Sequence, residues 1–128
     1  MIKEIKGLFI KEPWISLILE GKKTWEIRGS NSKIRGRIAL IASGTGEVKG
    51  YVDIVDSIEI DRKKFKNNSS KHLVDLNKYS EGKMPYKKTY AWVFSNPKKL
   101  DNGIKFKSKK GCVIWINLNE KEIIKKSY

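Results

Sequence analysis

The amino-acid sequence predicts an α+β fold, a barrel-like sheet of about five to seven short, mostly antiparallel strands with two or three short helices. The chain has 128 residues, which suits a single domain that buries its own core. Short apolar runs with strand periodicity recur along it, and turn residues separate them. Helical periodicity is limited to small segments. These observations favour a barrel-like or mixed sheet over a doubly wound parallel sheet.

The first half of the chain is predicted to contain one helix and most of the strands. Pro13 favours the first turn of this helix, and Glu12 lies at its positive end. The apolar residues of 14–19 cluster on one side, and Gly21 ends the helix. Gly50, inside a later strand, indicates a bulge or a barrel bend. The predicted strands of this half are 7–10, 24–28, 37–43 and 48–55.

The second half begins with a polar and irregular section, 61–88. Within it, Ser69 and Ser70 are predicted to cap and start a short helix that includes His72, Leu73 and Leu76. A second short helix is expected at the end of the chain, over 120–126. The sequence shows no internal repeat, linker or low-complexity tail, so residues 1–128 are expected to form one domain. The predicted strands of this half are 89–94, 104–106 and 112–118.

The chain is strongly basic. Lys and Arg total 28 against 14 Asp and Glu, and the formal net charge is +14. This excess favours polyanionic partners, because basic side chains bind phosphate backbones through counterion release. An anionic membrane surface would also attract it, but nucleic acid is the preferred interpretation. Many lysines, such as Lys63 and Lys64, are expected to be no more than solvated surface residues.

The chain has one cysteine and one histidine, Cys112 and His72. An internal disulfide is therefore excluded, and we expect neither a His/Cys metal site nor another cofactor. Cys112 lies in an apolar run and is expected in the core, while His72 is expected on a helix surface or at a pocket edge. No apolar stretch approaches the ~20 residues of a membrane span, and no secretory leader is apparent. The expected location is the reducing cytoplasm.

The most specific local pattern is the segment 21–28, Gly-Lys-Lys-Thr-Trp-Glu-Ile-Arg. On a strand, Glu26 and Arg28 share one face, and Lys23 at the preceding bend is expected to point toward the same pocket. Arginine can hold a carboxylate or a phosphate in a bidentate geometry that lysine cannot supply. The alternative is a surface ion pair between Glu26 and Arg28, worth about 0 to 1 kcal/mol.

Gly21, Lys23, Glu26 and Arg28 match the Gly-x-Lys-x-x-Glu-x-Arg signature of the ASCH domain, and Pro13-Trp14 with an apolar helix precede it. The chain therefore resembles the ASCH family of the PUA-like superfamily. The resemblance implies a PUA-like β-barrel with a cleft, the signature on the cleft floor, and RNA, a nucleoside or a nucleotide as the ligand. Looser matches to the family are Arg35-Gly36, Gly50 and Tyr90-Ala91-Trp92-Val93-Phe94.

Aromatic side chains are candidates for stacking on bases, which is worth about 1 to 3 kcal/mol per base. Trp14 is the best of them because it follows Pro13 at a helix start, and Trp92 is another. Core packing is an equally good interpretation for each candidate, and the preferred one for Trp25 and Trp115. The predicted ligand-binding residues are Trp14, Gly21, Lys23, Glu26, Arg28, Tyr86 and Tyr90.

Three other functions stay open. Some small bacterial ASCH proteins resemble amidohydrolases of N4-acetylcytidine that use a lysine and a threonine of the signature and a later glutamate. Lys23 matches the lysine, Glu26 stands at the threonine position, and the later acidic position falls near Asp75. Lys23 would then be a base or nucleophile and Glu26 a proton relay. A ribonuclease with Lys23, Tyr86 or Tyr90 as acid–base groups is the second alternative, and a module that binds protein partners in a larger assembly is the third.

Overall fold

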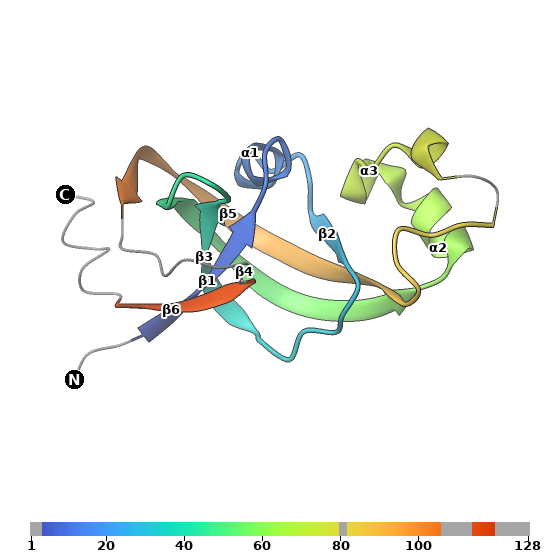
Figure 1. Ribbon diagram of the computed structural model, residues 1–128, viewed down its shortest axis with the longest axis horizontal. Helices are drawn as coiled ribbons and strands as arrows, with labels where there is room; N and C mark the ends of the chain where they lie inside the picture. Colours follow the sequence, from blue (N-terminus) through green and yellow to red (C-terminus); the bar gives the residue numbers. More distant parts are fainter. Residues whose placement is uncertain (1–3, 80–81, 106–113, 120–128) are drawn as a thin grey trace.

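The computed structural model describes residues 4–79, 82–105 and 114–119. They form one six-stranded sheet with the order β2-β5-β4-β3-β1-β6. The long strands β4 and β5 run side by side along the molecule, α1 lies over the sheet, and α2 and α3 lie at one end (Figure 1). The elements are β1 (Glu4–Ile10), α1 (Trp14–Leu19), β2 (Trp25–Arg28), β3 (Gly36–Ala42), β4 (Glu47–Ile60), α2 (Arg62–Asn67), α3 (Ser69–His72), η1 (Leu76–Lys78), β5 (Thr89–Lys105) and β6 (Trp115–Asn119).

The predicted α+β class with mostly antiparallel strands is confirmed. β1 pairs with β3 in parallel, and the other pairings among the described strands are antiparallel. The parallel pair arises because α1 and β2 lie between β1 and β3 in the chain. Backbone hydrogen bonds among the described strands leave β2 and β6 as sheet edges, so the sheet is curved but not closed into a barrel.

β4 and β5 are much longer than predicted, with 14 and 17 residues. The predicted strand 89–94 and the described part of the predicted strand 104–106 belong to this one strand β5, and the pair Asn96-Pro97 lies inside it. Tyr51 pairs with Lys98 and Asp53 with Ser95, so β5 has one more residue than β4 at this point. This bulge accommodates Pro97, which has no N–H to donate to a ladder.

The bulge predicted at Gly50 is confirmed. The register of β4 with β5 shifts between Val48 and Gly50. A Cβ atom at Gly50 would lie 2.4 Å from the Lys98 carbonyl oxygen and 2.6 Å from a methyl group of Leu19. Glycine is therefore required here because β5 and α1 both approach the backbone too closely for any side chain.

The core has three parts. The largest packs Ile15, Ile18 and Leu19 of α1 against the sheet. A second lies among β1, β3, β4, β6 and the end of β5. The third joins β2 to the helical end of the molecule, where Trp25 packs in a cluster with Phe65. The predicted core position of Trp25 is thus confirmed, whereas Trp115 is half-buried and contacts the first cluster.

The section between β4 and β5 is more regular than predicted. Helix α2 was missed because Phe65 is its one buried residue, so it has no apolar periodicity. Asp61 caps this helix by accepting from the Lys64 backbone N–H at 2.8 Å. The helix predicted at Ser69 and Ser70 is present as α3, but Asn68 and not a serine occupies its N-cap position. The helix ends at His72, before the predicted Leu73 and Leu76, because Leu73 has a left-handed φ of 59°.

Some predictions fall on residues outside the described ones. These are the core position of Cys112, the first residues of the strand predicted over 112–118, the last residue of the strand predicted over 104–106, and the terminal helix over 120–126. Within the described part of the chain, no helix is long and apolar enough to cross a membrane.

Candidate functional site

The signature segment connects α1 to the edge strand β2. Gly21 adopts φ 79° and turns the chain after the helix, a conformation that favours glycine. β2 then alternates as predicted, because Trp25 and Ile27 belong to a core cluster while Glu26 and Arg28 contact one another. Gly21 itself is exposed, and its role is to shape this turn. Among the described residues, a Cβ atom at Gly21 would approach only Pro97, and neither Glu26 nor Arg28.

Glu26 and Arg28 form a largely buried ion pair. The Nε and Nη2 atoms of Arg28 donate to Oε2 of Glu26 at 3.2 and 3.0 Å. The side chains are 8% and 19% exposed, respectively, so the pair is not the surface ion pair considered as the alternative. The Arg28 guanidinium also lies 5.4 Å from the ring centroid of Trp92, a distance at which cation–π attraction acts.

Arg28 also joins two strands that are not neighbours in the sheet. Its Nη2 atom donates to the carbonyl oxygen of Phe9 in β1 at 3.0 Å. β2 and β1 are separated by three strands in the hydrogen-bonded order. The sheet must therefore curl so that its β2 edge approaches β1, and the Arg28 side chain spans the gap that backbone hydrogen bonds leave open.

Lys23 is buried, with 1% exposure. Its Nζ atom donates to the carbonyl oxygen of His72 at 2.5 Å, lies 3.7 Å from Oε1 of Glu26, and stands 4.7 Å from the ring centroid of Trp14. Burial lowers the pKa of Lys23 to about 8, although the neighbouring Glu26 carboxylate opposes this by raising it. A substantial fraction of this amine is therefore neutral at weakly basic pH.

His72 is fully buried, so its predicted position on a helix surface or at a pocket edge is wrong. Its ring stacks on Phe65 with centroids 4.3 Å apart. Nδ1 accepts from the Val74 backbone N–H at 2.9 Å, which places the ring proton on Nε2, where it is donated to the Phe65 carbonyl at 2.6 Å. Burial lowers the pKa of His72 and keeps the ring neutral.

The aromatic candidates divide into two groups. Trp92 is 1% exposed and donates from Nε1 to the Ser30 carbonyl, so it is a core residue and cannot stack on a ligand base. Tyr90 is half-buried and is paired with Arg28 across β2 and β5. Tyr86 is 44% exposed, and its ring lies so close to Gly29 that a Cβ there would be 2.7 Å away.

The structure thus brings most of the predicted residues into one connected site. Contacts run from Trp14 to Lys23, to Glu26 and to Arg28, and Tyr90 lies beside Arg28. We call the three charged side chains Lys23, Glu26 and Arg28 the signature network. Asp75 is not part of it, because its carboxylate accepts from the Asn77 N–H at the start of η1.

Two elements of the site have no signal in the sequence. The carbonyl oxygens of Phe9 and His72 hold the two cations, and every residue carries such an acceptor whatever its side chain. Among the described residues, no group of three or more His, Cys, Asp or Glu is placed to hold a metal ion.

The fold and the site together define a class: a small α+β domain whose curled mixed sheet holds a buried charged network on its edge strand. A family model described as the ASCH domain matches residues 8–104. The chain therefore belongs to the ASCH domain family, and the resemblance seen in the sequence is confirmed. No curated protein matches the chain.

Solved structures of ASCH from Zymomonas mobilis have the same fold. One crystal structure without a stated substitution and one serine-to-alanine variant each give a TM-score of 0.73 at 15% identity, covering 94% of this chain and 92% of that chain. A tyrosine-to-phenylalanine variant gives a TM-score of 0.74 at 15% identity, with 97% and 96% coverage. The described strands and helices agree with a PUA-like fold.

Proposed function

We propose that this protein binds RNA or a nucleotide-sized ligand and that an anionic group of the ligand is held at the signature network. The observation that carries the proposal is a charge imbalance. Two cations, Lys23 and Arg28, share one carboxylate, Glu26, in surroundings from which water is largely excluded. An anion would compensate the excess charge, and membership in the ASCH family supports a nucleic-acid-binding type of domain.

Arg28 offers the first contact for such a ligand. Its Nε and Nη2 atoms are engaged by Glu26 and Phe9, whereas Nη1 makes no hydrogen bond to any residue that the structure describes. A phosphate oxygen bound at Nη1 would leave the ion pair to Glu26 in place. The half-buried Tyr90 and the exposed Tyr86 supply aromatic surface close by, on which a base can stack.

A second candidate function is hydrolysis, which the lowered pKa of Lys23 favours. A neutral amine beside a carboxylate can act as a base or nucleophile toward an amide such as that of N4-acetylcytidine, with Glu26 relaying the proton. Trp14 covers the amine, so this chemistry requires Trp14 to move when the ligand enters. Cleavage of RNA is a further candidate activity, which the same incubation tests. Binding to protein partners and a cytoplasmic location stay predictions.

Binding is tested with a mononucleotide and a single-stranded RNA of about ten nucleotides. Arg28→Gln and Lys23→Met are expected to weaken both ligands roughly tenfold or more, since each removes a charge from a site of low dielectric. Lys22→Gln is the matched control, because Lys22 is the next residue in the chain and its side chain is 67% exposed. Wild-type affinity in both folded site variants would contradict the proposed site.

Catalysis is tested by incubating the protein with N4-acetylcytidine and with the same RNA, and by following the products by chromatography and mass spectrometry. Release of cytidine or of RNA fragments that disappears in Lys23→Met would establish an enzyme with Lys23 at its centre. Absence of turnover at pH 7 and pH 9, on both sides of the Lys23 pKa of about 8, would contradict the hydrolase and leave binding as the function.

A further inference from the structure

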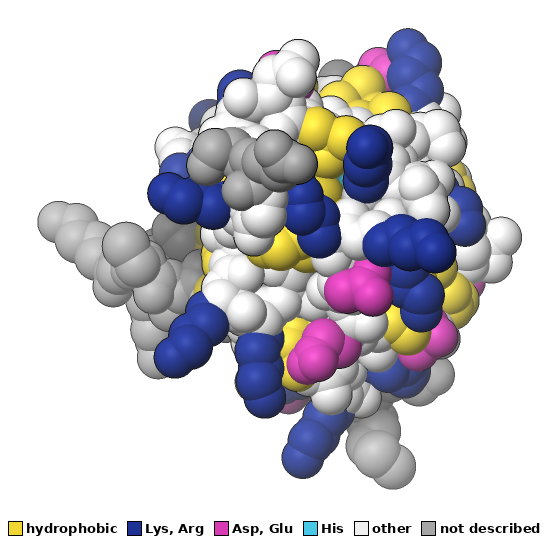
Figure 2. All heavy atoms as spheres, turned by 90° about the vertical axis from the view of Figure 1, so that its right-hand side faces the viewer, with side chains coloured by type: hydrophobic (Ala, Val, Ile, Leu, Met, Phe, Trp, Pro, Cys, Tyr) yellow, Lys and Arg dark blue, Asp and Glu magenta, His cyan; other side chains and the backbone are white. Residues whose placement is uncertain are grey.

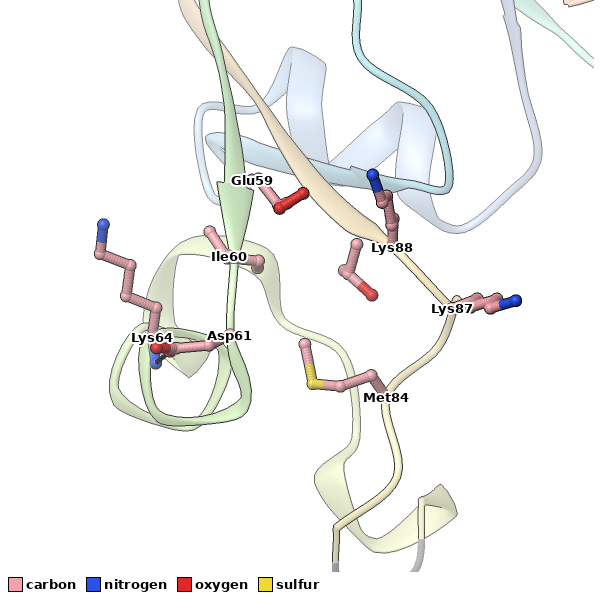
Figure 3. A pocket seen from close by; sticks show the side chains of 8 residues that line it. Glu59, Ile60, Asp61, Lys64, Met84, Lys87 and Lys88 are labelled. Carbon is pink, nitrogen blue, oxygen red and sulfur yellow. Dashed lines mark hydrogen bonds between the residues drawn. The ribbon is translucent and has the colours of Figure 1, made fainter.

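A hollow lies at the helical end of β4 and β5, beyond the signature network. Its volume is about 370 Å³, within the range of small-molecule pockets. We call it the β4–β5 hollow. Figure 3 shows that side chains from the end of β4, the start of β5, helix α2 and the loop before β5 surround it. The residues that line it are Glu59, Ile60, Asp61, Lys64, Met84, Lys87, Lys88 and Thr89.

Three lysines stand around the rim of this hollow. Lys64, Lys87 and Lys88 are exposed, and none forms an ion pair with a described carboxylate. Two carboxylates, Glu59 and Asp61, also line the hollow beside the three ammonium groups, and Oδ1 of Asp61 accepts from the Lys64 backbone N–H at the start of α2. The ammonium groups point in different directions (Figure 3), so together they can follow an extended anion.

The same excess of positive charge extends over this end of the molecule. Figure 2, which faces this end, shows Lys and Arg side chains spread across it, with a smaller group of acidic side chains. Asp75, one of the acidic residues of this section, is engaged at the start of η1. Such a surface attracts a polyanion from several directions. The exposed lysines between the end of β4 and the start of β5 are Lys63, Lys64, Lys66, Lys71, Lys78, Lys83, Lys87 and Lys88.

Two apolar side chains, Met84 and Ile60, contribute to the lining of the hollow beside the charged ones. Met84 is half-buried, and its side chain points toward the middle of the hollow (Figure 3). Ile60 of β4 is 5% exposed, and the hydroxyl of Thr89 donates to the Tyr86 carbonyl. An apolar side chain beside three exposed ammonium groups suits a ligand that carries both a flat apolar group and phosphates, which is the chemistry of a nucleotide in a strand.

The hollow adjoins the signature network. In the sheet register Arg28 is paired with Tyr90, and Tyr90 is paired with Glu59 at the edge of the hollow. Residues paired directly in antiparallel strands lie on one face with Cβ atoms about 4.5 to 5.5 Å apart. A row of neighbouring side chains therefore leads from Arg28 to the hollow, and the exposed Tyr86 ring lies alongside it against Gly29.

We propose that the β4–β5 hollow is a second nucleotide subsite, which takes the continuation of a single-stranded RNA from the signature network. The phosphates of the strand bind Lys64, Lys87 and Lys88, and a base lies against Met84. This inference rests on the proposed function, because it assumes that one nucleotide of the strand occupies the Arg28 site. A single strand is favoured over a duplex because its bases are free to stack on Tyr86 and to enter a concave site.

The test compares two triple variants with the same change in net charge. One removes the rim lysines, Lys64→Gln, Lys87→Gln and Lys88→Gln. The control removes three exposed lysines away from the hollow that form no ion pair with a described carboxylate, Lys6→Gln, Lys98→Gln and Lys99→Gln. Affinity for the mononucleotide and for the RNA of about ten nucleotides is measured over a range of salt concentrations.

The rim variant is expected to bind the mononucleotide like wild type but to bind the RNA roughly tenfold or more weakly. Its salt dependence should flatten, with the slope of log K against log salt smaller by about two, since each phosphate contact to a single strand contributes about 0.7. An equal loss of RNA affinity in the control variant would mean that net charge alone explains the effect, and it would overturn the inference. Unchanged RNA affinity in the rim variant would also overturn it.

Two further measurements separate this inference from the proposed function. If Arg28→Gln weakens both ligands and the rim variant weakens neither, the inference fails and the proposed function stands. If Arg28→Gln changes neither ligand, the proposed site fails, whatever the rim variant does. An RNA duplex of the same length is expected to bind the rim and control variants equally, and a rim-specific loss with the duplex would overturn the choice of a single strand.

Discussion

The ammonium group of Lys23 donates to the backbone carbonyl of His72, 49 residues further along the chain. The Thr24 N–H donates to the carbonyl of Lys71, the residue before His72, at 2.9 Å. The start of β2 is thus fixed by the end of α3, and the signature network depends on a segment that sequence patterns place outside it.

Acid should destabilise the fold through His72. Burial lowers the pKa of His72 below its ordinary value of 6.5, so the folded state binds fewer protons than the unfolded state as the pH falls. The stability that the neutral ring contributes is complete above pH 6.5 and is lost on acidification. Urea unfolding is expected to show a free energy of unfolding that falls from pH 7 to pH 5 more steeply in wild type than in His72→Gln. Equal slopes would contradict this.

Base should stabilise the fold through Lys23. Its pKa is lowered from 10.5 to about 8, so the unfolded state binds more protons between these values and the free energy of unfolding rises with pH there. The gain is complete above pH 10.5 and absent below pH 8. Lys23→Met should lack it, and the difference in slope between the two proteins is at most about 1.4 kcal/mol per pH unit. If the free energy of unfolding changed equally with pH in wild type and Lys23→Met from pH 8 to pH 10, the lowered pKa of the Lys23 amine would be refuted.

Glu26→Gln should destabilise the protein strongly. The variant leaves Lys23 and Arg28 buried without their shared counter-charge, and breaking a buried pair in this way costs about 3 to 5 kcal/mol. Glu20→Gln is the matched control, because its partner Lys22 is well exposed and a surface pair contributes about 0 to 1 kcal/mol. Chemical denaturation of both variants measures the difference. Similar losses in the two would show that the network is effectively solvated.

The features that local patterns encode were predictable. Alternation along β2 placed Glu26 and Arg28 on one face because a strand has a period of two. Gly50 indicated its bulge because close approach of other backbone is a common reason for glycine within a strand. The charged members of the signature motif were predicted to lie together because they belong to one turn and one strand, and their contacts agree with this.

Features that depend on tertiary packing were not predictable. The burial of His72 follows from its stacking on Phe65 and from carbonyl and N–H partners that no pattern marks. Trp92 is a core residue because it packs in the cluster that holds α1 and its ring stacks on Trp115, although its sequence neighbours fit an exposed position equally well. The continuation of β5 through Pro97 depends on one extra residue in its pairing with β4.

Trp14 should control access to the Lys23 amine. Its half-buried ring covers the ammonium group at 4.7 Å, and the other close partners of that group are the Glu26 carboxylate and the His72 carbonyl. Trp14→Ala removes the cover, so the amine gains water and its pKa should rise from about 8 toward 10.5.

Reductive methylation followed by peptide mass spectrometry measures how accessible the amine of each lysine is to the reagent. Lys23 is expected to be protected in wild type and modified in Trp14→Ala, whereas the exposed Lys22 should react in both. Trp14→Phe is the matched control, because a smaller ring still covers the amine. Equal protection of Lys23 in Trp14→Ala would mean that the His72 segment, and not Trp14, closes the site.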